Sequence, residues 1–328
     1  MKDLFKINLQ LFAEMNTNVT SDSGLSVEMK TFYDMTLIDE AQPNLVHDQF
    51  AQKRPIPANG GKKIEFRKFA SLPKALTALT EGVTPDGKKL TAEKIEAEVS
   101  QYGDYIVQSD VLELTSIDNT IVEATKILGN QAGLTLDTIT RNIMQSGTNV
   151  YYCPKGDGTV VESRSGLDAT CKLTVDVVKK VVAILRANNA PKINGDYVAI
   201  IHPYVAYDLM ADPAWIEAHK YATPDNIYEG EIGKIAGVRF VETSEAKVYE
   251  GGVFGCLFIA DGAYGTTEVT GGGLQTIVKQ KGSAGTADPL DQRSSIGWKA
   301  MKTAEILVDA YMMRVECKSA FSTDAKVN

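Results

Sequence analysis

Residues 230–237, with the sequence GEIGKIAG, are the part of this chain whose composition comes nearest to a phosphate-binding loop. Glycine allows backbone N–H groups to approach a phosphate closely. The segment lacks the Gly-Lys-Ser/Thr ending of a nucleotide-binding loop, and Val238, Arg239 and Phe240 predict a strand after it instead of a helix. We interpret it as a tight turn that enters a strand. An enzyme that binds phosphate near Gly230, with a long loop as its lid, remains an alternative.

A second group that could do chemistry is His202-Pro203, followed by Tyr204, Tyr207 and Asp208. Acid–base catalysis needs a nucleophile, a base and an orienting group that converge in one pocket. The sequence contains no such set, and proline is tolerated in the first turn of a helix. We therefore predict a strand-to-helix junction here, and no catalytic or cofactor-binding residue in the chain.

The side chains that could bind a metal are too dispersed to predict a metal site. The cysteines contain no CxxC pair, and no histidine has a ligand-type residue three or four positions away. We predict reduced thiols and neither a zinc site nor a disulfide framework from the spacing of Cys153, Cys171, Cys256, Cys317, His47, His202 and His219.

Composition restricts the possible partners. The net charge of −8 and the isoelectric point near 5.1 argue against tight binding to nucleic acid, which needs a surplus of Lys and Arg. No run approaches the roughly 18 apolar residues that a membrane span requires. A chain of 328 residues has room for two compact units.

Residues 6–13, KINLQLFA, precede a long polar stretch and cannot belong to a core. Asn8 and Gln10 interrupt the apolar run that a secretory signal would need. The string resembles the short leader of Firmicute ribosomal protein precursors and of capsid and scaffold proteins of their phages, which a cysteine protease removes after the alanine. That resemblance implies cleavage after Ala13, which leaves Glu14 as the first residue. A frayed N-terminus without processing is the alternative.

Residues 14–50 are polar at first and then mildly amphipathic, which predicts an arm with one short helix. Two segments with strict alternation follow and predict two strands, separated by more than twenty residues without a pattern. A two-stranded ribbon is marginally stable alone, so we expect a neighbouring copy to supply its missing surface. The predicted inter-subunit residues are Ile64, Phe66, Ile95, Ala97 and Val99.

Beyond the ribbon, apolar residues recur at three- and four-residue steps from residue 120 to Gly147 and predict one long helix, a spine. Residues 166–269 alternate helix and strand, which predicts an α/β unit, and the last portion is predicted to be mostly strand. Near its start, Arg293 follows Asp288 and Asp291, and we expect these residues to form a salt-bridge clamp between subunits or domains.

Several strings together resemble the major capsid proteins of tailed phages, whose Johnson fold is shared with herpesvirus floors and bacterial encapsulins. Within that fold the chain resembles the large-podovirus major capsid family, over residues 50–317. The strings are LTEG at 79–82, QYG at 101–103, SD at 109–110, GEIG at 230–233, GVR at 237–239, DPLDQR at 288–293 and GWK at 297–299.

The resemblance implies an α+β capsid fold with an arm at 14–50, an extended loop at 51–112, a peripheral domain at 113–165 and 270–328, and an axial domain at 166–269. It implies a non-enzymatic shell subunit that forms hexamers and pentamers around double-stranded DNA in the virion, assembled in the host cytoplasm. Expected partners are a separate scaffolding protein, a portal, decoration proteins and the leader-cleaving protease. No string predicts a covalent cross-link. An encapsulin-like compartment shell is the second hypothesis.

Overall fold

The computed structural model describes residues 45–57, 61–69, 72–79, 81–84, 86–115, 120–219, 233–268, 270–283, 288–322 and 325–328. The leader with its cleavage position at Ala13 and Glu14, most of the predicted arm, and Gly230 lie outside the described residues.

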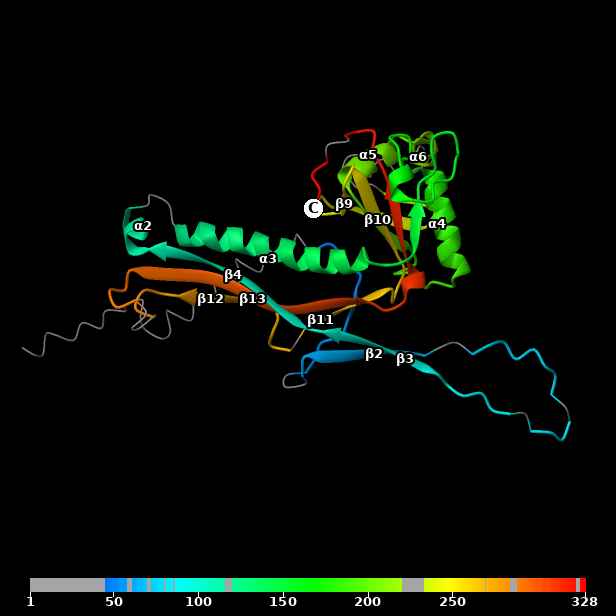
Figure 1. Ribbon diagram of the computed structural model, residues 1–328, viewed down its shortest axis with the longest axis horizontal. Coiled ribbons are helices and arrows are strands. Elements are labelled where there is room, and N and C mark those ends of the chain that lie inside the picture. The colour runs from blue at the N-terminus through cyan, green and yellow to red at the C-terminus, as the bar shows by residue number, and fades with distance from the viewer. Residues whose placement is uncertain are drawn as a thin grey trace, which may run out of the picture.

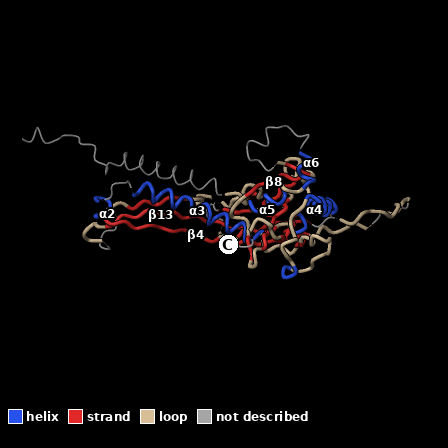
Figure 2. Tube along the Cα trace, turned by 90° about the horizontal axis from the view of Figure 1, so that it is seen from above, coloured by secondary structure: helices blue, strands red, loops and turns tan. Residues whose placement is uncertain are grey.

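The described part of the chain is elongated, with two sheets at its two ends (Figures 1 and 2). A five-stranded sheet has the order β1 (Gln52–Lys53), β11 (Tyr264–Glu268), β13 (Arg293–Ile306) and β12 (Gln275–Lys279), and β4 (Ser100–Ser109) also pairs with β13. The helix α3 (Thr120–Met144) lies along this sheet, and the short helix α2 (Asp110–Thr115) lies at its far end (Figure 1). This sheet and its two helices form a long, narrow unit.

The spine helix predicted from residue 120 is confirmed as α3, which has 25 residues. Its buried residues Leu128, Ala132 and Leu136 are spaced by four and form one stripe. They pack against Ile296, Trp298 and Ala300, which alternate along β13 and therefore share one face of the sheet. The apolar stripe of α3 thus packs on the apolar face of β13 in one layer.

The strand β4 was missed in the sequence because most of its side chains are polar or exposed. It pairs antiparallel with β13 over its whole length, from Ser100 opposite Lys302 to Ser109 opposite Arg293. Gly297 is required in this pair, because a Cβ there would lie 2.7 Å from the Cβ of Tyr105. Long-range pairing, which local sequence patterns do not report, therefore holds the five-stranded sheet together.

The other sheet is seven-stranded and forms the compact end of the molecule. Its order is β5 (Val150–Tyr152), β14 (Met312–Cys317), β10 (Val253–Ile259), β6 (Tyr197–Ile201), β8 (Val238–Glu242) and β7 (Lys234–Ile235), with β9 (Val248–Tyr249) beside β10. The helices α4 (Val175–Ala187), α5 (Pro203–Met210) and α6 (Pro213–His219) pack around it (Figure 1). Buried residues from β6, β10 and α4 form the largest apolar core.

Two local predictions in this unit are confirmed. Ala236 and Gly237 have φ values of 54° and 80° between β7 and β8, so the described end of the glycine-rich segment is a tight turn into a strand. Pro203 occupies the first turn of α5, and the His202 ring accepts a hydrogen bond from the Tyr204 N–H as the N-cap. His202 therefore has a structural role at this junction.

Three strands pair in a different sheet from the one that the predicted domain boundaries imply. β5 and β14 fall in the predicted peripheral segments, yet they pair in the seven-stranded sheet. β11 falls in the predicted axial segment, yet it pairs with β13. Two further elements are 3₁₀ turns, Arg164–Gly166 and Asp309–Tyr311, and the second separates β13 from β14.

A buried polar cluster fixes the first described residues to α3 and β13. The His47 backbone N–H donates to Asp137 Oδ1 at 2.7 Å, and His47 Nδ1 lies 2.6 Å from Asp137 Oδ2, with both side chains fully buried. Next to this pair, Thr140 donates to Asp48 at 2.8 Å and Lys302 donates to the other oxygen of Asp48. The cluster therefore connects the chain entry, α3 and β13.

We predict that Asp48→Asn lowers the free energy of unfolding by about 3–5 kcal/mol, because it leaves the Lys302 ammonium buried without a counter-charge. Chemical denaturation of the unassembled subunit measures this. The double variant Asp48→Leu/Lys302→Met is expected to lose much less stability than the single variant, since it removes both charges. Equal losses in the two variants would contradict a charge-pairing role.

Candidate assembly interface

The predicted ribbon exists, and its base is folded onto its own chain. β2 (Lys63–Phe69) and β3 (Ala92–Glu98) pair antiparallel, with Phe66 opposite Ile95, as the alternation predicts. Phe66, Ala97 and Val99 are buried within the chain, and the Phe66 ring lies against Gly265 of β11. Of the five residues predicted for inter-subunit contact, these three thus already have intramolecular cover, whereas Ile64 and Ile95 are half-buried.

Between the two strands, residues 72–91 extend away from the body as a long loop, which we call the tip (Figure 1). The described residues of the tip contain no helix or strand and are exposed throughout. Its large aliphatic side chains are between 56% and 86% exposed: Leu72, Leu76, Leu79, Val83 and Leu90. Five exposed aliphatics on one protruding loop are more than isolated surface residues explain, and they are typical of an interaction surface.

The free energy gained by burying the five tip side chains is close to the entropic cost of one association. Full burial of an aliphatic side chain contributes ~1.5–3 kcal/mol, so five side chains amount to about 10 kcal/mol. Association costs about 4–15 kcal/mol in lost freedom. One such contact is therefore marginal, and several contacts formed together are stable.

A second exposed apolar surface lies at the opposite end of the molecule, on α2 and the adjoining end of β4 (Figure 2). Its exposed residues are Tyr105, Val107, Val111, Leu112 and Leu114. The molecule therefore presents apolar side chains at both ends of its long axis, an arrangement suited to head-to-tail contacts between identical copies.

The predicted clamp is partly intramolecular. The Arg293 backbone N–H donates to Asp288 Oδ2 at 2.8 Å, and Arg293 Nε lies 3.7 Å from the same oxygen. Asp291 lies within 4 Å of the position that a Cβ on Gly282 would occupy. Asp288 therefore fixes the start of β13, and a role of the three residues between subunits remains a prediction.

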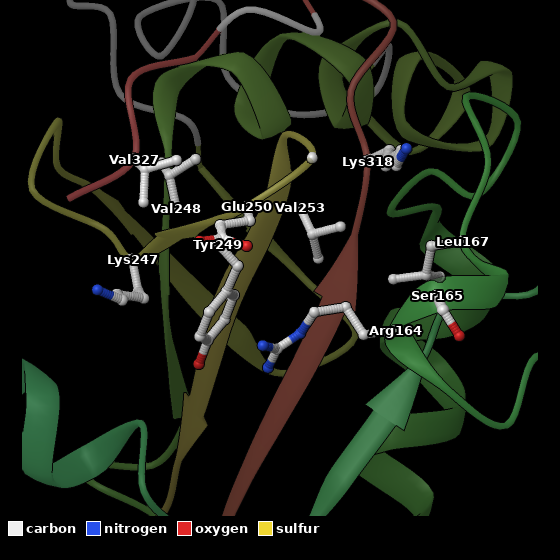
Figure 3. Close-up of a pocket in the computed structure, with 11 residues that line it drawn as sticks. Arg164, Ser165, Leu167, Lys247, Val248, Tyr249, Glu250, Val253, Lys318 and Val327 are labelled. Carbon is white, nitrogen blue, oxygen red and sulfur yellow. The ribbon is translucent and has the colours of Figure 1, made fainter.

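The compact end contains a pocket of about 670 Å³ between the 3₁₀ turn Arg164–Gly166, the β9–β10 hairpin and the C-terminal segment (Figure 3). Its floor is a fixed stack: the Arg164 guanidinium lies 3.6 Å from the centre of the Tyr249 ring. Two hydrogen bonds of 2.7 and 2.6 Å join Arg164 to the fully buried Glu316, and this pairing raises the pKa of the arginine. No local sequence pattern predicts this pocket, because its parts are distant in the chain.

Three of the cysteines converge in the structure although their spacing gave no sign of it. Cys256 Sγ lies 3.9 Å from Cys317 Sγ, and hydrogen bonds from the Cys153 and Cys256 thiols lower the pKa of Cys317. All four cysteines are free and buried. Within the described ranges, no group of three or more His, Cys, Asp or Glu is arranged to hold a metal ion, and no helix is long and apolar enough to cross a membrane.

Residues 109–269 match the family model described as phage capsid protein. No curated protein matches the chain significantly in sequence.

Solved structures match over most of the chain. The capsid asymmetric unit of cyanophage Pam1 has a TM-score of 0.66 at 12% identity and covers 86% of this chain and 93% of its own. The capsid of cyanophage P-SCSP1u gives 0.65 at 14% identity, with coverage of 83% and 87%. The capsid of Ralstonia phage GP4 gives 0.63 at 14% identity, with coverage of 85% and 89%.

The chain has the Johnson fold of phage capsid proteins. The α+β fold class expected from the sequence is therefore confirmed, including the extended loop and the spine helix. At these identities the similarity establishes the fold, whereas the residues of the interface have to be argued from this chain.

We predict that trypsin cuts the unassembled subunit first in the tip, after Lys74, Lys88 or Lys89, because an exposed segment without ladder hydrogen bonds fits a protease active site. The fragments should remain associated, since β2 and β3 stay paired. Mass spectrometry of a time course identifies the first cut. An initial cut inside α3 or β13 would contradict the assignment of the tip as the protruding element.

Proposed function

We propose that this protein is the major capsid protein of a tailed phage, which assembles into hexamers and pentamers and forms an icosahedral shell around double-stranded DNA. The observation that carries the proposal is the tip: five exposed aliphatic side chains project from a ribbon whose base is anchored on the chain's own sheet. A loop held in this way can reach a neighbour without loss of the subunit's own fold.

The fixed base of the ribbon lowers the entropy cost of docking the tip on a neighbour. Phe66 is buried against β11, and the Arg54 guanidinium lies 5.7 Å from the centre of the Phe66 ring. Since the base is held, only the tip has to be ordered when it docks, which lowers the entropy cost of association. Ile64 and Ile95 are half-buried and lie opposite Ala97 and Phe66, so they add to the apolar surface of the ribbon base.

Two sequence features support a more specific assignment, the leader at residues 6–13 and the capsid-like strings. The leader resemblance supports cleavage between Ala13 and Glu14 by a cysteine protease in a Firmicute host, and the capsid strings support the large-podovirus type. A separate scaffolding protein, a portal and decoration proteins are the partners of such a shell, which assembles in the host cytoplasm. The net charge of −8 fits a shell that encloses DNA without binding its sequence.

Expression followed by electron microscopy and sedimentation tests the proposal. We predict closed particles or capsomers for the wild type, with scaffolding protein supplied. The variant Leu76→Glu/Leu79→Glu should abolish assembly, because a carboxylate cannot enter the apolar contact. Its thermal unfolding should match that of the wild type, since both side chains are exposed.

Val160→Glu is the matched control, because Val160 is equally exposed but lies in the compact end. It should assemble normally. Persistent monomers of the wild type at high concentration would contradict a shell subunit. Particles that enclose an enzyme instead of DNA would favour the compartment shell.

Intact mass of protein recovered from phage-infected cells tests the leader. We expect a first residue at Glu14, and Ala13→Asp should block the cut because the protease would have to accept a carboxylate next to the scissile bond. A mature mass that retains residues 1–13 would contradict processing.

A further inference from the structure

The exposed face of α4 carries a row of positive charge. The helix lies at the outer edge of the compact end (Figure 1), with one face buried in the apolar core and the opposite face exposed. On the exposed face, Lys179, Ala183 and Arg186 follow one another at steps of four and three residues, so they form one line. At a rise of 1.5 Å per residue, the two cations stand about 10 Å apart along the axis. In a chain of net charge −8, this row is a local excess of positive charge.

The cations of this face lack counter-charges in the described part of the chain. The one acidic residue of α4, Asp176, pairs with Lys180 at 2.7 Å. Lys179 and Arg186 form no salt bridge with any described residue, and neither does Lys192, which follows the helix in the sequence. The surface therefore presents three cations to solvent without an acid beside them.

Two of these cations converge on the turn between β7 and β8. Gly237 occupies this turn with a φ of 80°, and the position that its Cβ would take lies 3.6 Å from Arg186 Nη2 and 3.8 Å from Lys192 Nζ. The Lys192 ammonium also lies 5.9 Å from the centre of the Tyr197 ring, an attraction that favours this position. Like charges that flank one point repel each other unless an anion lies between them. The glycine leaves that point open.

Neighbouring described groups do not supply the missing negative charge. Asp196 is the carboxylate nearest to Lys192 in the sequence, and it lies 2.5 Å from Lys234 Nζ. The carbonyl end of α4 favours one cation, and Arg186 in the last turn meets that preference. This does not account for a second cation at the same point. An anion from outside the subunit accounts for both.

The row of cations selects an anion with repeated charge. Duplex DNA carries one negative charge per ~1.7 Å of its axis, so two of its phosphates can reach positions about 10 Å apart. A single carboxylate or an inorganic phosphate could occupy the Arg186–Lys192 pair but would not reach Lys179 at the same time. Arginine and lysine are the side chains that bind phosphate most strongly. Because the whole chain is acidic, a polyanion meets repulsion elsewhere, and the contact is confined to this row.

We propose that α4 and the β7–β8 turn bind the phosphate backbone of the enclosed duplex DNA, with one phosphate between Arg186 and Lys192 over Gly237 and another at Lys179. The inference rests on the proposed shell function, which supplies the DNA. The contact is weak and independent of base sequence, in keeping with the net charge of the chain. It also gives a role to the described end of the glycine-rich segment, since a side chain at residue 237 would obstruct the phosphate.

Lysine acetylation of the unassembled subunit tests the contact residue by residue. A succinimidyl ester transfers its acetyl group to a free amine and releases N-hydroxysuccinimide, so a covered lysine reacts slowly. Titration with a short DNA duplex should protect Lys179 and Lys192, whereas the exposed Lys89 of the tip should react as before. Inorganic phosphate at the same ionic strength should leave Lys179 unprotected. Protection of Lys192 by inorganic phosphate but not by the duplex, or equal protection of all three lysines, would overturn the proposal.

Duplex binding measured by fluorescence anisotropy supplies a second readout. A rise in salt from about 50 to 200 mM should weaken binding about tenfold, because two phosphates are neutralised. Arg186→Gln/Lys192→Gln should also weaken it about tenfold at low salt, with thermal unfolding unchanged because both side chains are exposed.

Lys88→Gln/Lys89→Gln is the matched control, since it removes the same charge from exposed positions in the tip. It should leave duplex binding nearly unchanged. Equal losses in the two double variants would show an effect of net charge alone and would overturn the proposal. Particles that form normally from subunits without duplex binding would overturn this inference and leave the shell function intact. Duplex binding by subunits that form no particles would contradict the shell function instead.

Discussion

The structure depends on one constraint: the aliphatic side chains of the tip have no apolar surface of the described chain beneath them. At the base of the ribbon, Phe66, Ala97 and Val99 are buried within the chain. The aliphatic side chains of the tip are exposed. Exposed apolar side chains gathered on one loop are typical of a surface that another molecule covers. The phage capsid fold of the chain is consistent with that requirement.

The rest of the molecule holds the base of the ribbon in a fixed position, from which the tip projects. β4 continues almost directly from β3 and pairs with β13 over ten residues, so the ribbon is held in line with the longest pairing in the structure. Leu128, Ala132 and Leu136 of α3 pack on one face of β13 and so cover that pairing. The buried pairs of His47 with Asp137 and Asp48 with Lys302 then tie the chain entry to the same layers. Buried ion pairs add little net stability but specify a unique geometry.

Local patterns were enough to predict the elements with strong periodicity. The spacing from residue 121 to residue 143 gave α3, and alternation at Ile64, Phe66, Ile95 and Ala97 gave β2 and β3. Non-local pairing was out of reach: β4 is mostly polar and finds its register only against β13, and β14 joins β10 across the predicted domain boundary. The pocket and the cysteine group were missed for the same reason, since residues 164, 249 and 316 meet only in the folded chain. The inter-subunit role of the five ribbon residues stays a prediction, because a period-two pattern shows that a face is buried but not by which molecule.

Hydrogen–deuterium exchange of residues 72–91, compared between unassembled subunits and closed particles, tests whether a neighbouring copy covers the tip. We expect rapid exchange in the subunit and strong protection in the particle, with little change in α4 or β10, which are already buried. Equal and rapid exchange of this segment in both states would contradict it.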